Sequence, residues 1–337
     1  DRSSRTLPAP SANAYRRPHA GDVVGRETEL RRCAQSLLNK ICPENVSTIA
    51  SRIKNEANVL TVSELELVIG CIFKKALAEP HYCETYADLV YNLKGEMPEF
   101  PSEDGGKPVT FKAMLLTVCQ NEFDSMPRTL DPSEEDKGKY DAEELEFRKG
   151  QSKKRFLANM KFIGHLFLRQ LLSTKVISSI VHELMCCDTD DAPEEYIVEC
   201  ICELLLAIGY TLEAMPAGKA AVTTVCGRML DLKQRKRKDG KGLYTKRIQF
   251  TIQDVLDTRA KGWARKVFKT TAKTKDEVRQ AQEREFQAHG TGKDASGAEI
   301  VVVGQRPVYL TDPQGAKEAA SGGPGWQEIS KARKDRR

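Results

Sequence analysis

The chain has 337 residues, of which 40% are hydrophobic and 30% are charged, and its formal net charge at pH 7 is +5. This composition can fill a hydrophobic core beneath a charged surface, which excludes a wholly disordered protein. The sequence has no run of 18 apolar residues and no signal-peptide pattern, so we predict no membrane contact.

The N-terminal part of the chain predicts a disordered segment and four helices. Residues 1–26 are rich in Pro, Ser, Arg and Ala and have no hydrophobic periodicity, so we expect them to be disordered. Apolar residues then recur with the 3- and 4-residue spacing of one helix face. Pro43 begins the second helix, Ser63 and Glu66 resemble the capping box of the third, and Pro80 separates the third helix from the fourth.

The middle of the chain predicts a Pro- and Gly-rich loop, a fifth helix ("VTFKAMLLTVCQNEF") and an insertion. Residues 125–154 are acidic and then mixed in charge, with few apolar anchors. We therefore expect a flexible acidic insertion at about 125–154 that leads into a helix.

The most apolar run, Arg155–Ser173, follows this insertion. It is too short to cross a bilayer and contains basic residues, so we expect a core helix that is packed on most of its circumference. One of its faces is polar and is either a solvated edge or part of a partner surface. The residues expected in the core are Phe156, Met160, Ile163 and Phe167, and the polar face carries Lys161, His165 and Arg169.

Four more helical patterns complete the folded part, and none shows sustained strand-like alternation. Helix pairs recur about every 40 residues, which is typical of HEAT repeats. Each pair must stack on its neighbours to bury its apolar face. We therefore predict an all-α fold, a HEAT-type α-solenoid of about five antiparallel helix pairs over residues 27–263, between disordered N- and C-terminal segments.

The C-terminal part, residues 264–337, contains more basic than acidic residues, and we expect it to be a basic, mostly disordered tail. Trp263, just before it, is expected to pack on the last helix. Only Glu299–Leu310 is strand-like, and because it is isolated in a polar tail we expect no stable sheet there. It is either a short recognition segment or an idle part of the tail.

Six segments between about Ser36 and Trp263 resemble, in the same order, the middle domain of eukaryotic translation initiation factor 4G. They are "SLLNKICPENVSTIASRI", "IFKKALAEPHYCETYADLVYNL", "FKAMLLTVCQNEF", "KKRFLANMKFIGHLFLRQLLS", "VECICELLLAIGYTLEAM" and "RIQFTIQDVLDTRAKGW".

This resemblance implies a cytoplasmic translation-initiation scaffold that binds the DEAD-box RNA helicase factor 4A and contacts mRNA or ribosomal RNA. The helicase would grip edges at both ends of the solenoid. The scaffold would then favour the productive arrangement of the two helicase lobes and raise ATPase turnover. Further implied partners are the 43S/48S preinitiation complex and a cap-binding protein. The usual cap-protein docking motif is not found, since Ala20 follows Tyr15 at the leucine position and Glu146 follows Leu145 at the hydrophobic position after Tyr140.

The candidate helicase-binding residues lie at helix ends near the N-terminal end of the solenoid, and in the helix that resembles the family's "FIGELF" segment. For the two phenylalanines of that helix, a purely structural role in the core is the alternative. The candidates are Glu64, Leu65, Glu66, Glu79, Pro80, His81, Tyr82, Phe162 and Phe167.

The candidate RNA-binding residues lie in "LKQRKRKDGKGLYTKR", where Gly residues indicate an exposed loop between the last two helices. Basic side chains there can neutralise phosphates without base specificity, and a tyrosine can stack on a base. The alternative is an ordinary solvated loop. The candidates are Lys233, Arg235, Lys236, Arg237, Lys238, Lys241, Tyr244, Lys246 and Arg247.

No catalytic or cofactor-binding motif is present, so we predict no enzymatic activity, no cofactor and no bound metal. Most of the ten cysteines lie in apolar helical patterns, as expected of small core residues in a reduced protein. Zinc binding by His182 and the nearby cysteines is not expected, because Cys200 and Cys202 lack the spacing of a structural zinc site.

Two other functions remain open from the residues. One is a related helical scaffold in mRNA decay or nuclear cap binding. The other is an RNA-modifying enzyme whose active site is not recognisable in the sequence.

Overall fold

A computed structural model describes residues 25–101, 108–127, 129–130, 138–238, 240–268 and 298–311. Within these ranges the fold is all-α apart from one two-stranded sheet, which confirms the predicted fold class. Its long helices are α1 (Arg26–Leu38), α2 (Val46–Arg52), α3 (Val62–Ala78), α4 (Cys83–Leu93), α5 (Phe111–Asp124), α7 (Ala142–Leu168), α8 (Thr174–Leu184), α9 (Glu195–Glu213), α10 (Pro216–Gln234) and α11 (Lys246–Ala260).

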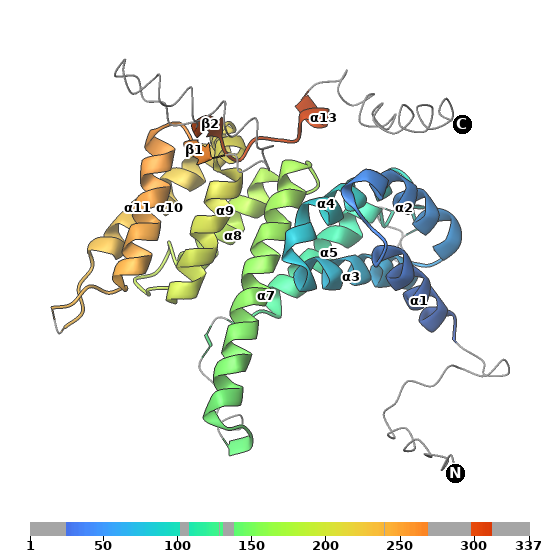
Figure 1. Ribbon diagram of the computed structural model, residues 1–337, viewed down its shortest axis with the longest axis horizontal. Helices are drawn as coiled ribbons and strands as arrows, with labels where there is room; N and C mark the ends of the chain where they lie inside the picture. Colours follow the sequence, from blue (N-terminus) through green and yellow to red (C-terminus); the bar gives the residue numbers. More distant parts are fainter. Residues whose placement is uncertain are drawn as a thin grey trace, which may run out of the picture.

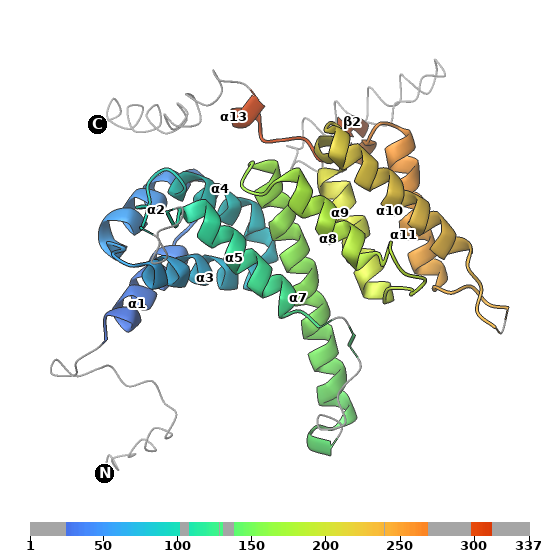
Figure 2. The same ribbon diagram turned by 180° about the vertical axis from the view of Figure 1, so that it is seen from behind.

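The helices stack in two rows along one elongated molecule (Figures 1 and 2). In one row α2 packs on α4, α4 on α7, α7 on α9, and α9 on α11. The other row places α1 on α3 and α3 on α5, and α8 on α10. One contiguous core of buried apolar side chains runs through both rows. Each helix therefore buries its apolar face against the helix two positions along the chain, as expected of stacked repeats.

Helix α3 begins earlier than the sequence pattern suggested. The N-cap is Thr61, whose side chain accepts a hydrogen bond from the Glu64 backbone N–H at 3.2 Å. The Glu64 carboxylate in turn accepts from the Leu60 N–H at 2.8 Å. The capping box predicted at Ser63 and Glu66 is therefore wrong by two residues, because Thr61 provides the same chemistry one half-turn earlier.

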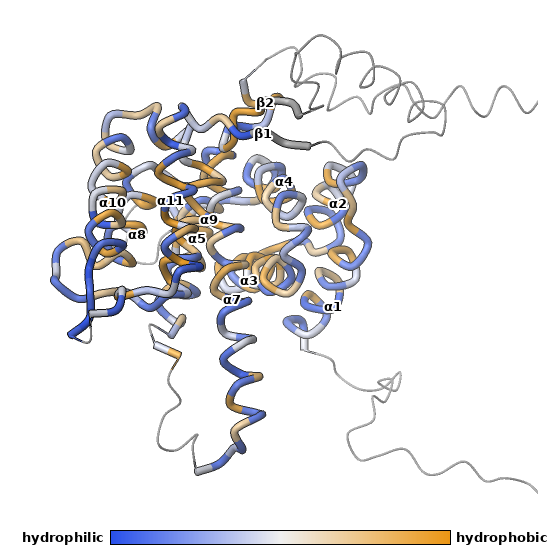
Figure 3. The backbone as a smooth tube through the Cα atoms, turned by 60° about the vertical axis from the view of Figure 1, so that its left-hand side comes forward, coloured by the Kyte–Doolittle hydropathy of each residue, from blue (hydrophilic) through white to orange (hydrophobic). Residues whose placement is uncertain are grey.

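The expectation of a flexible insertion at 125–154 is corrected in its second half, because α7 begins at Ala142. Asp141 caps this helix by accepting from the Glu144 N–H at 2.8 Å, and Arg148 pairs with Glu144 one turn away. No α7 residue before Phe156 is buried, and this arm of the helix projects beyond the solenoid as a mostly hydrophilic segment (Figure 3). Local capping and ion pairs, together with the packed second half, account for its helicity.

The second half of α7 occupies the core as predicted. The row expected to be apolar and buried, Phe156, Met160, Ile163 and Phe167, is almost fully buried. The predicted polar stripe needs a correction at Arg169, which is only 1% exposed and follows the helix as its C-cap. Its guanidinium donates to both carboxylate oxygens of Asp88 on α4, at 2.6 and 2.8 Å.

The C-terminal tail is also corrected, because part of it is ordered against the helices. Strand β1 (Ala264–Phe268) pairs antiparallel with β2 (Ala298–Val302). The chain then crosses the solenoid as residues 303–311, which we call the strap, and which end in the short helix α13 (Val308–Thr311). The expectation that the segment 299–310 forms no sheet is wrong, because the chain that follows α11 supplies a partner strand.

Trp263 packs on the helices, but its side chain lies against α9 rather than on the last helix as expected. It is buried, and its indole N–H donates to the Glu213 carboxylate at 2.8 Å. Residues 1–24, 269–297 and 312–337 lie outside the described residues, as do the expectations of disorder for them. Within the described part of the chain, none of the helices is both long and apolar enough to span a bilayer.

Candidate partner-binding rims and basic loop

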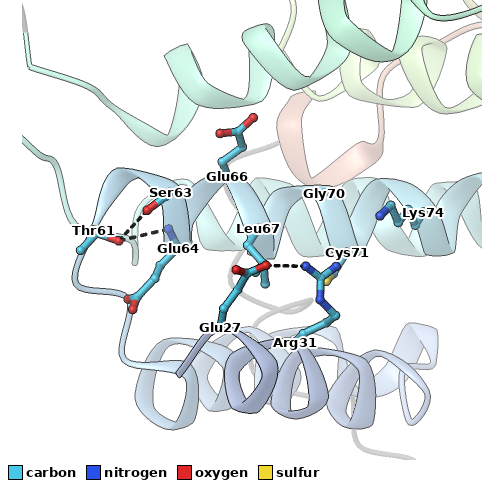
Figure 4. A pocket seen from close by; sticks show the side chains of 10 residues that line it. All are labelled: Glu27, Arg31, Thr61, Ser63, Glu64, Glu66, Leu67, Gly70, Cys71 and Lys74. Atoms are coloured by element: carbon cyan, nitrogen blue, oxygen red, sulfur yellow. Dashed lines mark hydrogen bonds and ion pairs between the residues drawn. The ribbon is translucent and has the colours of Figure 1, made fainter. Parts of the chain in front are cut away.

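The start of α3 forms a polar rim at the N-terminal end of the solenoid. A cleft of about 450 Å³ lies between α1 and α3, with Glu27 and Arg31 on one side and Glu66 and Lys74 on the other (Figure 4). Glu66 is exposed, as a contact residue must be. Leu65, by contrast, is fully buried, so its predicted contact with a helicase is corrected to a place in the core.

Glu64 is engaged inside the protein rather than offered to a partner. Its carboxylate pairs with the Arg26 guanidinium at 2.5 Å and receives the Leu60 N–H. The hydrogen bond from Arg26 lowers the pKa of Glu64, even though partial burial opposes the shift. Glu64 therefore joins α1 to the start of α3 and forms part of the lining of the cleft.

The turn between α3 and α4, Pro80–Tyr82, is a second exposed feature of the N-terminal half, and it lies against α7. His81 and Tyr82 are exposed, Tyr82 by 44%. The side chain of Glu79 is fixed by two hydrogen bonds, because its carboxylate accepts from Lys75 Nζ and from the Tyr86 hydroxyl, each at 2.6 Å. The turn therefore presents His81 and Tyr82 on a base fixed by Glu79.

The two phenylalanines predicted to bind a helicase are core residues in this structure. Phe162 and Phe167 are buried, and the Phe162 ring meets the Phe73 ring edge-on with centroids 4.8 Å apart. A buried ring cannot touch a partner while the repeat is folded. The structure therefore supports their structural alternative and corrects the expectation of direct contact.

At the opposite end of the solenoid, the sequence reasoning missed Phe250 on α11. Its side chain is 72% exposed, beside a cleft of about 630 Å³ that Leu206 of α9 also lines. Ile248, Ile252 and Val255 form the buried face of α11. Phe250 is spaced two residues from both isoleucines, which places it on the other side of the helix. An aromatic residue out of phase with the apolar face was the signal available in the sequence.

The basic loop between α10 and α11 is folded back on itself. Lys236 and Gly242 form an isolated antiparallel bridge, and the Arg237 guanidinium donates to the Leu243 carbonyl at 3.1 and 2.8 Å. Arg235 donates to the Asp190 carbonyl at 2.7 Å. The arginines thus hold the shape of the loop, whereas Lys236, Lys238 and Lys241 extend to solvent as exposed residues.

The other four predicted RNA-binding residues have partners inside the protein, Lys246 among them through a hydrogen bond to the Gln249 side chain at 3.3 Å. Tyr244 is buried and donates its hydroxyl to the Pro193 carbonyl at 2.8 Å, and burial raises its pKa. Stacking of Tyr244 on a base is therefore corrected to a structural role. Lys233 bonds to the Gln253 side chain. Arg247 pairs with Glu199 at 2.5 Å, and both Arg247 and Lys246 remain exposed.

The ten cysteines are free thiols, and six of them are buried. Burial raises the pKa of Cys202 and of Cys200 to about 12, which makes these thiols poor nucleophiles at neutral pH. Within the described ranges, no group of three or more His, Cys, Asp or Glu residues is placed to hold a metal ion.

Comparison with known proteins identifies proteins that are similar to the chain. The family model described as "MIF4G domain" matches residues 31–262. The chain is 29% identical, over 84% of its length, to a protein of Arabidopsis thaliana named eukaryotic translation initiation factor 4G, and 32% identical over 80% to the protein of that name in Triticum aestivum. It is 30% identical over 73% to eukaryotic translation initiation factor 4 gamma 3 of Mus musculus.

The chain spans only a small part of these relatives, covering 16%, 18% and 15% of their respective lengths. Among solved structures, the MIF4G domain of Trypanosoma cruzi translation initiation factor EIF4G5 is 20% identical to this chain. The match covers 70% of this chain and 97% of that one, with a TM-score of 0.43.

Proposed function

The chain belongs to the MIF4G domain family, and from that premise we propose that it is a translation-initiation scaffold that binds and activates a factor 4A-type DEAD-box RNA helicase. In this role it also contacts RNA and links mRNA to the small ribosomal subunit. The observation that carries the proposal is the family match over residues 31–262, together with relatives whose names are those of initiation factor 4G. The family is one of non-enzymatic scaffolds, so a catalytic role is not among the candidates.

Further parts of the proposal concern the protein as a whole. We extend the proposal to a cytoplasmic location and to contact with the 43S/48S preinitiation complex and a cap-binding protein, which would accord with the names of these relatives. The names of these relatives also favour initiation over mRNA decay or nuclear cap binding.

The proposed mechanism uses the two ends of the solenoid. Glu66, His81 and Tyr82 offer contacts at the N-terminal end, and Phe250 offers an exposed aromatic anchor at the C-terminal end. A two-lobed helicase that bridges these ends is held in a narrow range of lobe orientations. If the productive orientation binds better than the open one, the scaffold shifts the population towards it and turnover rises.

The proposed RNA contact uses the exposed lysines of the basic loop. Lys236, Lys238 and Lys241 are exposed on a loop whose shape is set by Arg235 and Arg237. Such lysines neutralise phosphates and release counterions, so the affinity is sensitive to salt and tolerant of sequence.

The experiment is a steady-state ATPase assay of a purified factor 4A-type helicase with RNA, with and without the chain. We expect the chain to bind the helicase and to raise its turnover. A chain that neither binds nor stimulates the helicase contradicts the proposal.

A variant assigns the effect to the C-terminal end. Phe250→Ala should weaken helicase binding with little effect on folding, because the removed ring is mostly exposed. The matched control is Leu116→Ala, which removes an exposed apolar side chain from α5 and should leave binding unchanged. Equal binding by both variants would remove Phe250 from the interface.

A further inference from the structure

The strap crosses the solenoid although it lies outside the residues 31–262 that the family model matches. Figures 1 and 2 both show it running from β2 past the end of α7 towards α4. It is an addition to the repeat fold, and it contacts three successive helices of one row of the stack, α9, α7 and α4.

The first attachment is on α9 and the end of α11. The Gly304 carbonyl accepts from the Thr211 hydroxyl at 2.7 Å, and the Val303 N–H donates to the Trp263 carbonyl at 2.9 Å. Gly304 has a φ of +78°, and a Cβ there would lie 3.1 Å from the Ala207 carbonyl oxygen. Only glycine combines this backbone conformation with such a close approach to a helix.

The second attachment is at the C-terminal end of α7. Arg306 donates to the Leu168 carbonyl at 3.0 Å, and its guanidinium lies 5.7 Å from the centroid of the Phe167 ring. The last carbonyls of a helix have no partner within the helix and carry its negative dipole end. A cationic donor from the strap satisfies one of them.

The third attachment is on α4. The Tyr309 hydroxyl donates to Asp88, and the Tyr309 ring lies 5.8 Å from the Tyr91 ring. Asp88 is the residue that holds the buried guanidinium of Arg169. The strap therefore joins the ion pair that connects α4 to the end of α7.

We propose that the strap is an intramolecular brace that fixes the curvature of the solenoid between α4 and the last helices. In stacked repeats each unit contacts only its neighbours, so small rotations add up along the stack. A segment anchored on α4, α7 and α9 limits the total rotation between these helices. The consequence for activity rests on the proposed function. A docked strap holds the two ends of the solenoid at the distance that the helicase needs.

Docking of the strap is reversible in this proposal. Its polar anchors are a few hydrogen bonds, and each adds little net stability because water competes for the same groups. Docking is favoured because the strap belongs to the same chain, which gives it a high effective concentration near its attachment points on the helices. Removing two anchors should therefore release the strap while the helices remain folded.

The test uses the full chain and amide hydrogen exchange of the strap. In Arg306→Ala/Tyr309→Ala we expect exchange of residues 305–311, beyond the attachment at Gly304, to quicken by about tenfold or more, with an unchanged helical circular dichroism spectrum. The matched control is Val308→Ala, since Val308 is 72% exposed and anchors nothing. Equal exchange in the wild-type chain and the double variant overturns the docking on which the brace depends.

The second readout is the ATPase assay. The double variant should still bind the helicase but stimulate it roughly two- to fivefold less than the wild-type chain. The reason is that the distance between the two ends of the solenoid then varies over a wider range. Faster strap exchange with undiminished stimulation overturns the brace. If the wild-type chain itself gives no stimulation, the proposed function fails instead, and the exchange comparison still reports on the strap.

Discussion

Arg169 is a fully charged side chain inside the core, held by a bidentate pair with Asp88. Burial by itself would lower its pKa, but the hydrogen bonds and charge of Asp88 more than compensate, and the pKa of Arg169 is raised. A buried charge of this kind is tolerated only while its partner is present.

Removal of that partner should therefore be costly. We expect Asp88→Asn to lower the free energy of unfolding by about 3 kcal/mol, because the guanidinium is left without a full counter-charge. Glu84→Gln is the control, since the Glu84 carboxylate is 66% exposed and lies 3.4 Å from Arg169. Urea unfolding checks both variants, and a similar loss for the two would show that the pair with Asp88 has no special weight.

His165 lies beside this ion pair and makes stability depend on pH. Burial, and then repulsion by Arg169 and Lys161, lower the pKa of His165 from its ordinary value of 6.5, although Glu84 and Asp88 oppose the shift. The unfolded chain then binds a proton at a higher pH than the folded chain. The contribution of His165 to stability is complete above pH 6.5 and falls as the pH drops from 6.5 towards the folded-state pKa.

The prediction is read as a difference between proteins. The free energy of unfolding should fall between pH 7 and pH 5 more steeply for the wild-type chain than for His165→Gln, because glutamine takes up no proton. Parallel profiles for the two proteins would mean that His165 titrates alike in the folded and unfolded states.

At the scale of elements, the contact of α9 with the residues after α11 depends on one glycine. A Cβ at Gly209 would lie 2.3 Å from the Trp263 ring. The indole of Trp263 packs against the bare backbone of α9 at this position, and strand β1 begins with the next residue, Ala264. The helical pattern alone does not reveal this use of Gly209, because it does not show which distant side chain packs against a glycine in a helix.

Two glycine substitutions should consequently act in opposite directions. Gly209→Ala should lower the free energy of unfolding by roughly 1–3 kcal/mol through overpacking, and it should change the fluorescence of Trp263. Gly227→Ala on α10 should raise it by about 0.5–1 kcal/mol, since nothing lies within 4 Å of its new Cβ and alanine favours the helix. Thermal unfolding of the two variants side by side checks this, and equal effects would contradict it.

At the scale of the whole molecule, the two ends of the solenoid carry different surfaces, and the basic loop belongs to the end that also carries Phe250. Figure 1 shows the loop between α10 and α11 at one extremity of the solenoid and α1 near the other. A partner that touches both ends must therefore span the stack, whereas RNA can be held at one end without obstructing the other.

The contribution of the loop to RNA affinity can be isolated by salt. We expect Lys236→Glu/Lys238→Glu to weaken binding of single-stranded RNA and to reduce the slope of log affinity against log salt by about 1.4, or 0.7 for each lost phosphate contact. Arg237 stays in place because it holds the loop together. Lys94→Glu, at the exposed end of α4, is the control for charge reversal. An unchanged slope in the double variant would remove the loop from the RNA surface.

Much of the fold was predictable from local patterns. The buried row of α7, the breaks near Pro43 and Pro80, and the stacking of helix pairs all follow from apolar periodicity and turn residues, which act over a few positions. The candidate sites were less predictable. The burial of Phe162 and of Tyr244 depends on which element lies opposite, and a single helix pattern does not state that.

The sequence by itself determined that this protein is a stack of amphipathic helices with charged rims, because the spacing of apolar side chains along each helix selects its buried face. Only the tertiary structure decided that Arg169 and Tyr244 are internal and that the strap docks beside Asp88. Those outcomes join residues that are far apart in the chain, such as Asp88 and Tyr309, and their energies arise only when folding brings the partners together.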